Sequence, residues 1–135
     1  DGVSIAEFPT TLEAAEASRG AGIKVMMGAP NLVRGGSHSS NVAAEDLARA
    51  GSLEILSSDY VPASLLMAAF ELPRRVETIT LPEAIATVSR NPAQATGLKD
   101  RGEIAPGLRA DLIRVAVRDG APAVRRAWKA GERVL

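Results

Sequence analysis

The chain has 135 residues, the size of one ordinary domain, and 46% of them are apolar, which is enough to bury a core. Sixteen basic residues balance sixteen acidic ones, which leaves no charge footprint for nucleic acid or an anionic membrane, so neither is expected as a partner. The chain has no cysteine, which excludes disulfides and cysteine-type zinc sites and fits a reducing, cytoplasmic setting. Aromatic residues make up only 3%, so the core has to be aliphatic.

The sequence is also examined for membrane-spanning and signal segments. No apolar run approaches the roughly 18–20 residues that span a bilayer, and no basic start precedes an apolar stretch, so neither a membrane span nor a signal peptide is expected. The sequence opens with Asp1, without a Met, and enters a strand-like run almost at once. We therefore expect it to be a piece of a longer protein.

The first seventy residues repeat strand, loop and helix. The strand-like runs are 3–6, 23–27 and 53–57, and the helical stretches are 10–19, 42–50 and 62–72. Thr10 and Glu13 form a capping-box pattern at the first helix, and 23–27 is apolar enough for a strand that is covered on both faces. Residues 28–41 are expected to form a long loop. This alternation predicts parallel strands with helices outside them.

The second half has a different character. Thr80 and Glu83 predict another capped helix, running to about residue 89, and a short turn of helix is expected to reach Thr96. Beyond residue 100, glycines and prolines mark turns between three β-like runs. These runs, at 110–115, 123–128 and 132–135, predict a small antiparallel ribbon.

Asp59 is the strongest candidate for chemistry. It lies just past the strand at 53–57, and in βα-barrels the carboxyl ends of the strands form the active-site face. A carboxylate at this position can bind a metal or accept a proton from the attacking water. The alternative is a turn residue that caps the helix after Pro62.

A loop rich in small residues carries the second candidate. Gly35 and Gly36 favour an anion-binding nest of backbone amides, Arg34 suits a phosphate, and the single histidine, His38, is able to ligate a metal or act as acid or base. The alternative is an exposed flexible loop, since no Walker-type or dinucleotide pattern is present.

Polar residues also follow the first two strands. Glu7 and Asn31 occupy places equivalent to that of Asp59, so three consecutive strands each deliver a polar side chain toward one face; ordinary strand-to-loop polarity is the alternative. A complete metal site needs about three or four protein ligands, commonly rich in histidine. One histidine cannot supply them, so the site is expected to be incomplete within this chain.

The closing third of the chain resembles the end of the amidohydrolase superfamily. The resemblance is carried by residues 91–93 with 97–98, by 100–112 and by 128–134. It implies an α/β fold, with the last three βα units of a TIM-type (β/α)8 barrel at 1–98. It also implies that 99–135 form the C-terminal strands of a small composite β-sandwich.

The front half resembles one branch of that superfamily, which works in the carbon–phosphorus lyase pathway. The segments that carry this resemblance are 7–11, 27–31, 34–39 and 57–62. It implies a parent enzyme that releases pyrophosphate from a ribose 5-triphosphate bearing a 1-phosphonate, with a divalent metal, expected to be zinc, that the isolated piece holds weakly or not at all. Asp59 matches the metal-site Asp. The candidate substrate-binding residues are Glu7, Asn31, Arg34, Gly35, Gly36 and His38.

Two other readings stay open. One is another amidohydrolase, such as a deacetylase or a cyclic-amide hydrolase. The other is a folding or oligomer module that has no activity in isolation. Three parallel strands would leave edges and apolar faces uncovered, so self-association into a homo-oligomer is expected.

Overall fold

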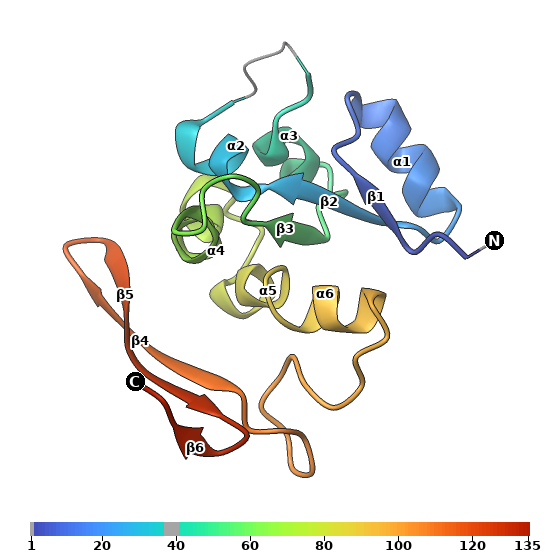
Figure 1. The fold of residues 1–135 in the computed structure, drawn as a ribbon. Helices are drawn as coiled ribbons and strands as arrows, with labels where there is room; N and C mark the ends of the chain where they lie inside the picture. Colours follow the sequence, from blue (N-terminus) through green and yellow to red (C-terminus); the bar gives the residue numbers. More distant parts are fainter. Residues whose placement is uncertain (1, 37–40) are drawn as a thin grey trace.

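Two three-stranded sheets organise the chain, and a set of short helices lies between and around them (Figure 1). In this computed structural model residues 2–36 and 41–135 are described. The elements in chain order are β1 (Ile5–Glu7), α1 (Leu12–Gly20), β2 (Lys24–Gly28), α2 (Ala29–Arg34), α3 (Ala44–Arg49), β3 (Ile55–Ser57), α4 (Ser64–Arg75), α5 (Leu81–Ala86), α6 (Arg90–Ala95), β4 (Leu112–Arg118), β5 (Ala121–Lys129) and β6 (Glu132–Arg133).

The first sheet is parallel, with the strand order β1-β2-β3. Its register pairs Ala6 with Val25 and Met27 with Leu56. Because side chains alternate along a strand, these four residues share one face of the sheet. The predicted α/β class with parallel strands is therefore confirmed.

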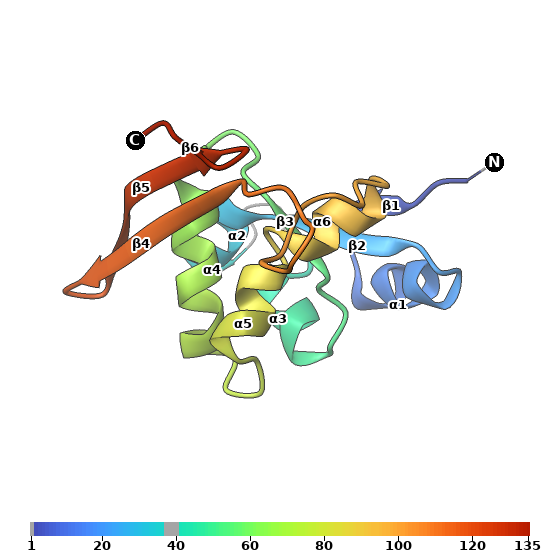
Figure 2. The ribbon, with the colours of Figure 1, turned by 90° about the horizontal axis from the view of Figure 1, so that it is seen from below.

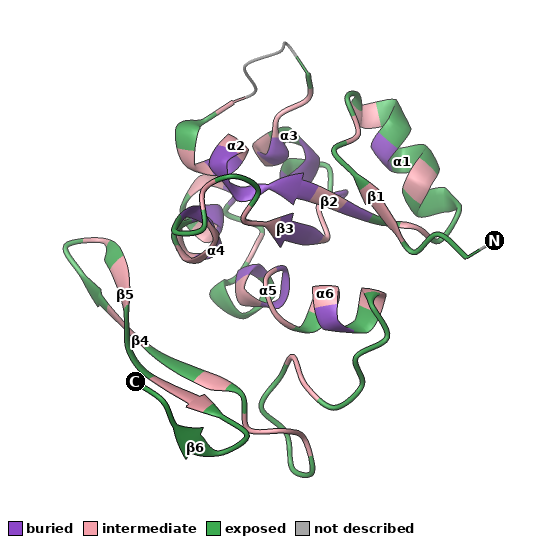
Figure 3. Cartoon of the chain, viewed as in Figure 1, coloured by how far each residue is buried: buried purple, intermediate pink, exposed green. Residues whose placement is uncertain are grey.

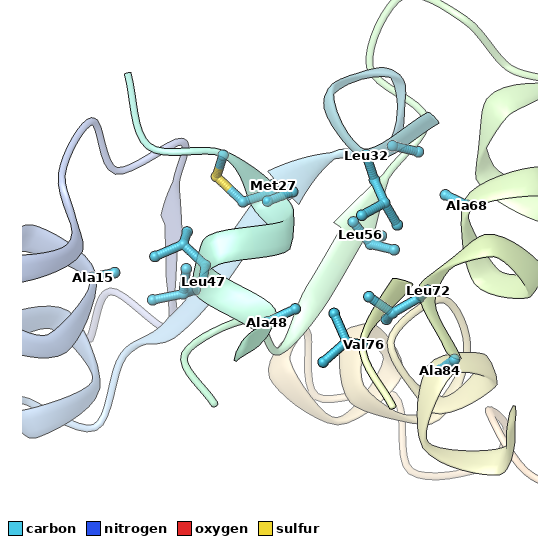
Figure 4. Close-up of a cluster of buried hydrophobic side chains, with 13 residues drawn as sticks. Ala15, Met27, Leu32, Leu47, Ala48, Leu56, Ala68, Leu72, Val76 and Ala84 are labelled. Carbon is cyan, nitrogen blue, oxygen red and sulfur yellow. The ribbon is translucent and has the colours of Figure 1, made fainter. Parts of the chain in front are cut away.

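That face packs against α1 to α5 in a core built only from aliphatic side chains and methionine (Figure 4). Val25, Leu47 and Leu72 are completely buried. Figure 3 shows burial concentrated on β2, β3 and the helices around them, whereas the second sheet is half-buried or exposed. The parallel sheet and the helices packed on it thus form a buried core that holds the ends of the strands in place.

The starts of two helices test the predicted capping boxes. At α5 the box is present: the backbone N–H of Thr80 donates to Glu83 Oε2 (2.7 Å), as does the Thr80 hydroxyl (2.6 Å). At α1 the prediction was wrong by one residue, because Thr11 is the N-cap and its hydroxyl accepts from the N–H of Ala14 (3.2 Å). The carbonyl of Thr10 instead accepts from the N–H of Val42 (2.9 Å) and ties the start of α1 to the segment before α3.

The free edge of β3 is covered by the chain between α5 and α6. The N–H of Leu56 donates to the carbonyl of Thr87 (3.0 Å), and the side-chain amide of Asn91 donates to the carbonyl of Glu54 (2.8 Å). The sequence predicts open sheet edges. The edge of β3 is covered because α5 and α6 fold back beside this strand (Figure 1). The oligomeric state stays a prediction.

The second sheet is the antiparallel ribbon β4-β5-β6, longer than the sequence predicts and bent where its register shifts between Arg114 and Val115. Figure 2 shows it beside α4. Arg74 of α4 donates to the carbonyl of Gly120 in the β4–β5 turn (3.2 Å). No helix within the described ranges is both long and apolar enough to cross a membrane.

Candidate functional site

A cleft of about 250 Å³ lies at the carboxyl ends of the three parallel strands. Its walls come from the segments that follow β1, β2 and β3, since parallel strands deliver their ends to one edge of a sheet. The lining residues are Phe8, Pro9, Met27, Gly28, Pro30, Asn31, Arg34, Gly36, Asn41, Val42, Asp59 and Tyr60. Four residues expected to bear on function therefore line one cleft: Asn31, Arg34, Gly36 and Asp59.

Asp59 sits in the turn after β3 with a φ of 50°, a left-handed conformation that a non-glycine residue adopts rarely. Its side chain is exposed and reaches over the end of β2. A Cβ atom added to Gly28 would lie 2.9 Å from Oδ2 of Asp59, so the acid occupies the space that a side chain at Gly28 would need. This places a carboxylate at the mouth of the cleft, and the catalytic and metal-binding role of Asp59 stays a prediction.

Ser57 lies beside Gly28 on the sheet face opposite the helices, because the register pairs these two residues. Its Oγ atom is buried and has no hydrogen-bond partner among the described residues. A buried hydroxyl without a partner is uncommon in proteins and costs free energy. The sheet face opposite the helices therefore carries, two residues before Asp59, a buried hydroxyl without a hydrogen-bond partner among the described residues.

Asn31 lines the cleft, but its side chain also has a structural task. Its Oδ1 accepts the backbone N–H of Ala44 (2.8 Å), the first residue of α3. The first N–H groups of a helix have no partner inside the helix, so this bond replaces a side-chain cap, which α3 lacks at Ala43. Asn31 thus joins α2 to α3 and fixes the wall of the cleft.

Arg34 and Tyr60 meet on that wall. Nη1 of Arg34 donates to the Tyr60 hydroxyl (2.6 Å), and the guanidinium carbon lies 5.4 Å from the centre of the tyrosine ring. This distance is within the range of a cation–π contact. A hydrogen bond and a ring contact together orient the guanidinium at the cleft.

The amide nest predicted at Gly35 and Gly36 does not form. Gly35 ends α2 in the left-handed conformation (φ 84°), and its N–H donates to the carbonyl of Leu32 (3.1 Å). The N–H of Gly36 donates to the carbonyl of Asn31 (3.1 Å). The prediction was wrong because residues 29–34, which were expected to lie in a loop, form helix α2. The carbonyl groups near the end of this helix accept the hydrogen bonds of both glycine N–H groups.

The remaining predicted residues are placed differently. Glu7 is the exposed last residue of β1 and is not among the lining residues; the next residue, Phe8, takes that place with a φ of 54°. His38 lies outside the described residues. Sequence reasoning also missed Tyr60, although its position directly after Asp59 was a usable signal.

The described residues do not make a metal centre on their own. Within 2–36 and 41–135 no group of three His, Cys, Asp or Glu side chains is close enough together to hold a metal ion. Asp59 offers one carboxylate, whereas protein zinc sites use three or four ligands. The cleft therefore contains one donor suited to a metal and not a complete set.

An acid in the turn after a parallel strand, in a cleft at the carboxyl edge of an α/β sheet, lies at the edge where enzymes with α/β sheets place their active sites. Comparison with known proteins specifies the class further. The sequence profile of the amidohydrolase family matches residues 3–134, and the chain belongs to this family.

Two kinds of relative match the chain. It is 57% identical over 135 residues to the alpha-D-ribose 1-methylphosphonate 5-triphosphate diphosphatase of Escherichia coli (strain K12), covering 99% of this chain and 36% of the relative. It is 39% identical over 92 residues to the imidazolonepropionase of Deinococcus deserti, covering 62% of this chain and 21% of that protein. The imidazolonepropionase of Ruegeria sp. (strain TM1040) is 47% identical over 51 residues, 38% of this chain and 13% of that protein. The chain spans about a third or less of the length of these curated relatives.

Proposed function

We propose that the chain belongs to a metal-dependent hydrolase that releases pyrophosphate from a ribose 5-triphosphate carrying a 1-phosphonate, in phosphonate catabolism. The observation that carries this proposal is the 57% identity over nearly the whole chain to the diphosphatase of Escherichia coli. The matched region includes every lining residue of the cleft, because the match covers 99% of the chain.

The proposed architecture follows from the two sheets. Residues 1–98 correspond to the last three βα units of a TIM-type barrel, with the face of Gly28 and Ser57 toward the barrel interior. Residues 99–135 correspond to the C-terminal part of a β-sandwich. Its support is the apolar side of the ribbon, where Ile113 and Val117 are 57% and 47% exposed and would be covered by further strands.

Asp59 is the proposed proton acceptor for the attacking water. Its carboxylate is exposed in the cleft and is a base of the type used for this task. Amidohydrolase superfamily members are generally metal-dependent. Because Asp59 offers only one ligand, we propose that residues beyond these 135 complete the ligand set, with zinc as the metal, and that Asp59 contributes to that set.

Arg34 is the proposed contact for the phosphate groups. Its guanidinium lies at the cleft wall, and a guanidinium forms paired hydrogen bonds with phosphate oxygens. His38 and Glu7 are further candidates for the substrate, from segments next to the cleft. Gly36 and Asn31 line the wall of the cleft. The N–H groups of Gly35 and Gly36 are not proposed to bind the substrate, because they donate hydrogen bonds to carbonyl groups of helix α2.

The second candidate is another amidohydrolase activity, such as that of a deacetylase or a cyclic-amide hydrolase. It is favoured by the imidazolonepropionase relatives, whose matches cover up to 68% of the chain. The deciding experiment uses the full-length protein that contains this chain, assayed on a ribose triphosphate and on a panel of cyclic and acetylated amides. We expect pyrophosphate release and no amide turnover. Amide turnover without pyrophosphate release would overturn the first candidate in favour of the second.

A further inference from the structure

The contact between Arg34 and Tyr60 joins two elements that are distant in sequence. Arg34 is the last residue of α2, and Tyr60 lies in the turn between β3 and α4. They share a hydrogen bond of 2.6 Å and a ring contact of 5.4 Å, and both line the cleft. The contact therefore joins the end of α2 to the turn after β3 along the cleft wall.

Stability does not account for this contact. Tyr60 is 62% exposed and Arg34 is exposed as well. Solvent screens such surface pairs, and they add little to folding free energy. The chain has one tyrosine in 135 residues, and that residue lies at the mouth of the cleft and not in the core.

The backbone of Asp59 sets the direction of both neighbouring groups. Its left-handed turn (φ 50°) sends the carboxylate over the end of β2, against Gly28. The next residue, Tyr60, then reaches the end of α2 and Arg34. One turn thus presents the acid to the cleft and also fixes the cation that faces the same space.

We propose that Tyr60 is a positioning residue that sets the location of the Arg34 guanidinium, and through it the affinity of the cleft for the substrate phosphates. The inference rests on the proposed function, because it assumes a phosphorylated substrate. A long arginine side chain has many rotamers, and a partner that selects one of them reduces the entropy lost on binding. Tyr60 supplies the ring that supports the guanidinium and the hydroxyl that orients it.

The first test measures KM and kcat of pyrophosphate release in the full-length protein. Tyr60→Leu removes ring and hydroxyl, Tyr60→Phe keeps the ring, and Arg118→Lys on β4 is the control. We expect Tyr60→Leu to raise KM about 3- to 10-fold with little change in kcat, and Tyr60→Phe to restore part of that loss. Equal KM values for Tyr60→Leu and wild type would overturn the inference.

The second test separates positioning from direct contact with the substrate. Tyr60→Leu is combined with Arg34→Lys, which keeps the charge and removes the fork. If Tyr60 acts through Arg34, Tyr60→Leu adds little to the KM increase in the Arg34→Lys background. An equal increase in both backgrounds would mean that Tyr60 acts independently of Arg34, which contradicts the inference.

A binding measurement distinguishes failure of this inference from failure of the proposed function. Titration calorimetry with inorganic pyrophosphate is performed on the wild type and on Tyr60→Leu. Weaker pyrophosphate binding by the variant supports the inference even if the triphosphate is not hydrolysed, in which case only the proposed function fails. Equal binding by both proteins, or no binding by the wild type, overturns the inference.

Discussion

The carboxylate of Asp59 lies where a side chain on Gly28 would be: a Cβ atom at Gly28 would come within 2.9 Å of Oδ2 and 3.3 Å of Cβ of Asp59. Gly28 itself has ordinary extended angles (φ −73°, ψ 129°), so its backbone does not require glycine. What requires glycine is the space. Because Gly28 at the end of β2 has no side chain, the carboxylate of Asp59 from the turn after β3 can lie against it.

Gly28→Ala in the full-length protein should therefore impair catalysis more than folding. The Oδ2 atom can rotate away, but the contact with the Asp59 Cβ requires the turn to give by a few tenths of an ångström. Because misplacement by about 1 Å can cost two orders of magnitude, we expect this smaller shift to lower kcat/KM by on the order of 10-fold. The matched control is Gly20→Ala, where nothing lies within 4 Å of the added Cβ. Wild-type kcat/KM in Gly28→Ala would contradict the prediction.

Asp59→Asn should remove activity and leave the fold intact. Asparagine tolerates the left-handed conformation, so the turn is kept, but the amide cannot accept the proton from water. The expected loss in kcat is on the order of 10²- to 10⁴-fold, as for other general bases. Asp119→Asn is a strict control, since Asp119 has the same φ of 50° in the distant β4–β5 turn. A similar loss in both variants would point to a stability effect, which thermal unfolding would reveal.

Asn31→Ala should destabilise the packing of α2 against α3. The variant leaves the N–H of Ala44, a buried residue, without the Oδ1 acceptor that lies 2.8 Å away. Losing such a cap costs about 0.5–2 kcal/mol of unfolding free energy. Asn31→Asp keeps the acceptor and should retain wild-type stability in urea denaturation. Equal unfolding midpoints for the alanine variant and the wild type would refute the capping role.

The capping box at α5 should give stability a pH dependence. The Thr80 hydroxyl, followed by the Thr80 backbone N–H, lowers the pKa of Glu83 below its ordinary value of 4.5. A lowered pKa in the folded state means that the contribution is present above about pH 4.5 and is lost as the pH falls through the folded pKa. The stability difference between the wild type and Glu83→Gln should thus shrink on acidification from neutral pH. Glu77→Gln, in the exposed turn after α4, is the matched control for the loss of one surface carboxylate.

The isolated chain of 135 residues should neither hold a catalytic metal tightly nor turn over substrate. The described residues provide one metal-suited carboxylate in the cleft, and three or four ligands are needed. Elemental analysis of the purified chain and an assay with added zinc are the measurements. Stoichiometric zinc together with metal-dependent hydrolysis would show that these residues suffice.

Much of the parallel sheet could be predicted because its signals are local. The apolar run at 23–27 became β2, and the stretch at 42–50 became α3 at Ala44–Arg49. Helix α2 was missed because residues 28–41 are rich in Gly, Ser and Asn, which favour loops. The signal that indicated it was Pro30 near a helix start, followed by Gly35 at the end.

The site was predictable only as far as topology fixes it. Asp59 and Asn31 reach one cleft because parallel strands end at one edge. The pair of Arg34 and Tyr60 was not predictable, since it depends on the left-handed turn at Asp59 and on the missed helix α2. Because α2 was missed, the N–H groups of Gly35 and Gly36 were predicted to bind the substrate. In the structure they donate to backbone carbonyl groups of α2.

The hydrogen bond from Leu56 to Thr87 has a consequence for any shortened version of the protein. This bond satisfies the backbone N–H of Leu56, which points away from β2 at the edge of the sheet. A version that stops before Thr80 would lose this partner and also the amide of Asn91 that holds Glu54. A bare edge of apolar parallel strands is a template for adding a strand from another molecule, the first step of fibril growth. The α5–α6 segment therefore occupies the edge of β3 that a strand from another molecule would otherwise use.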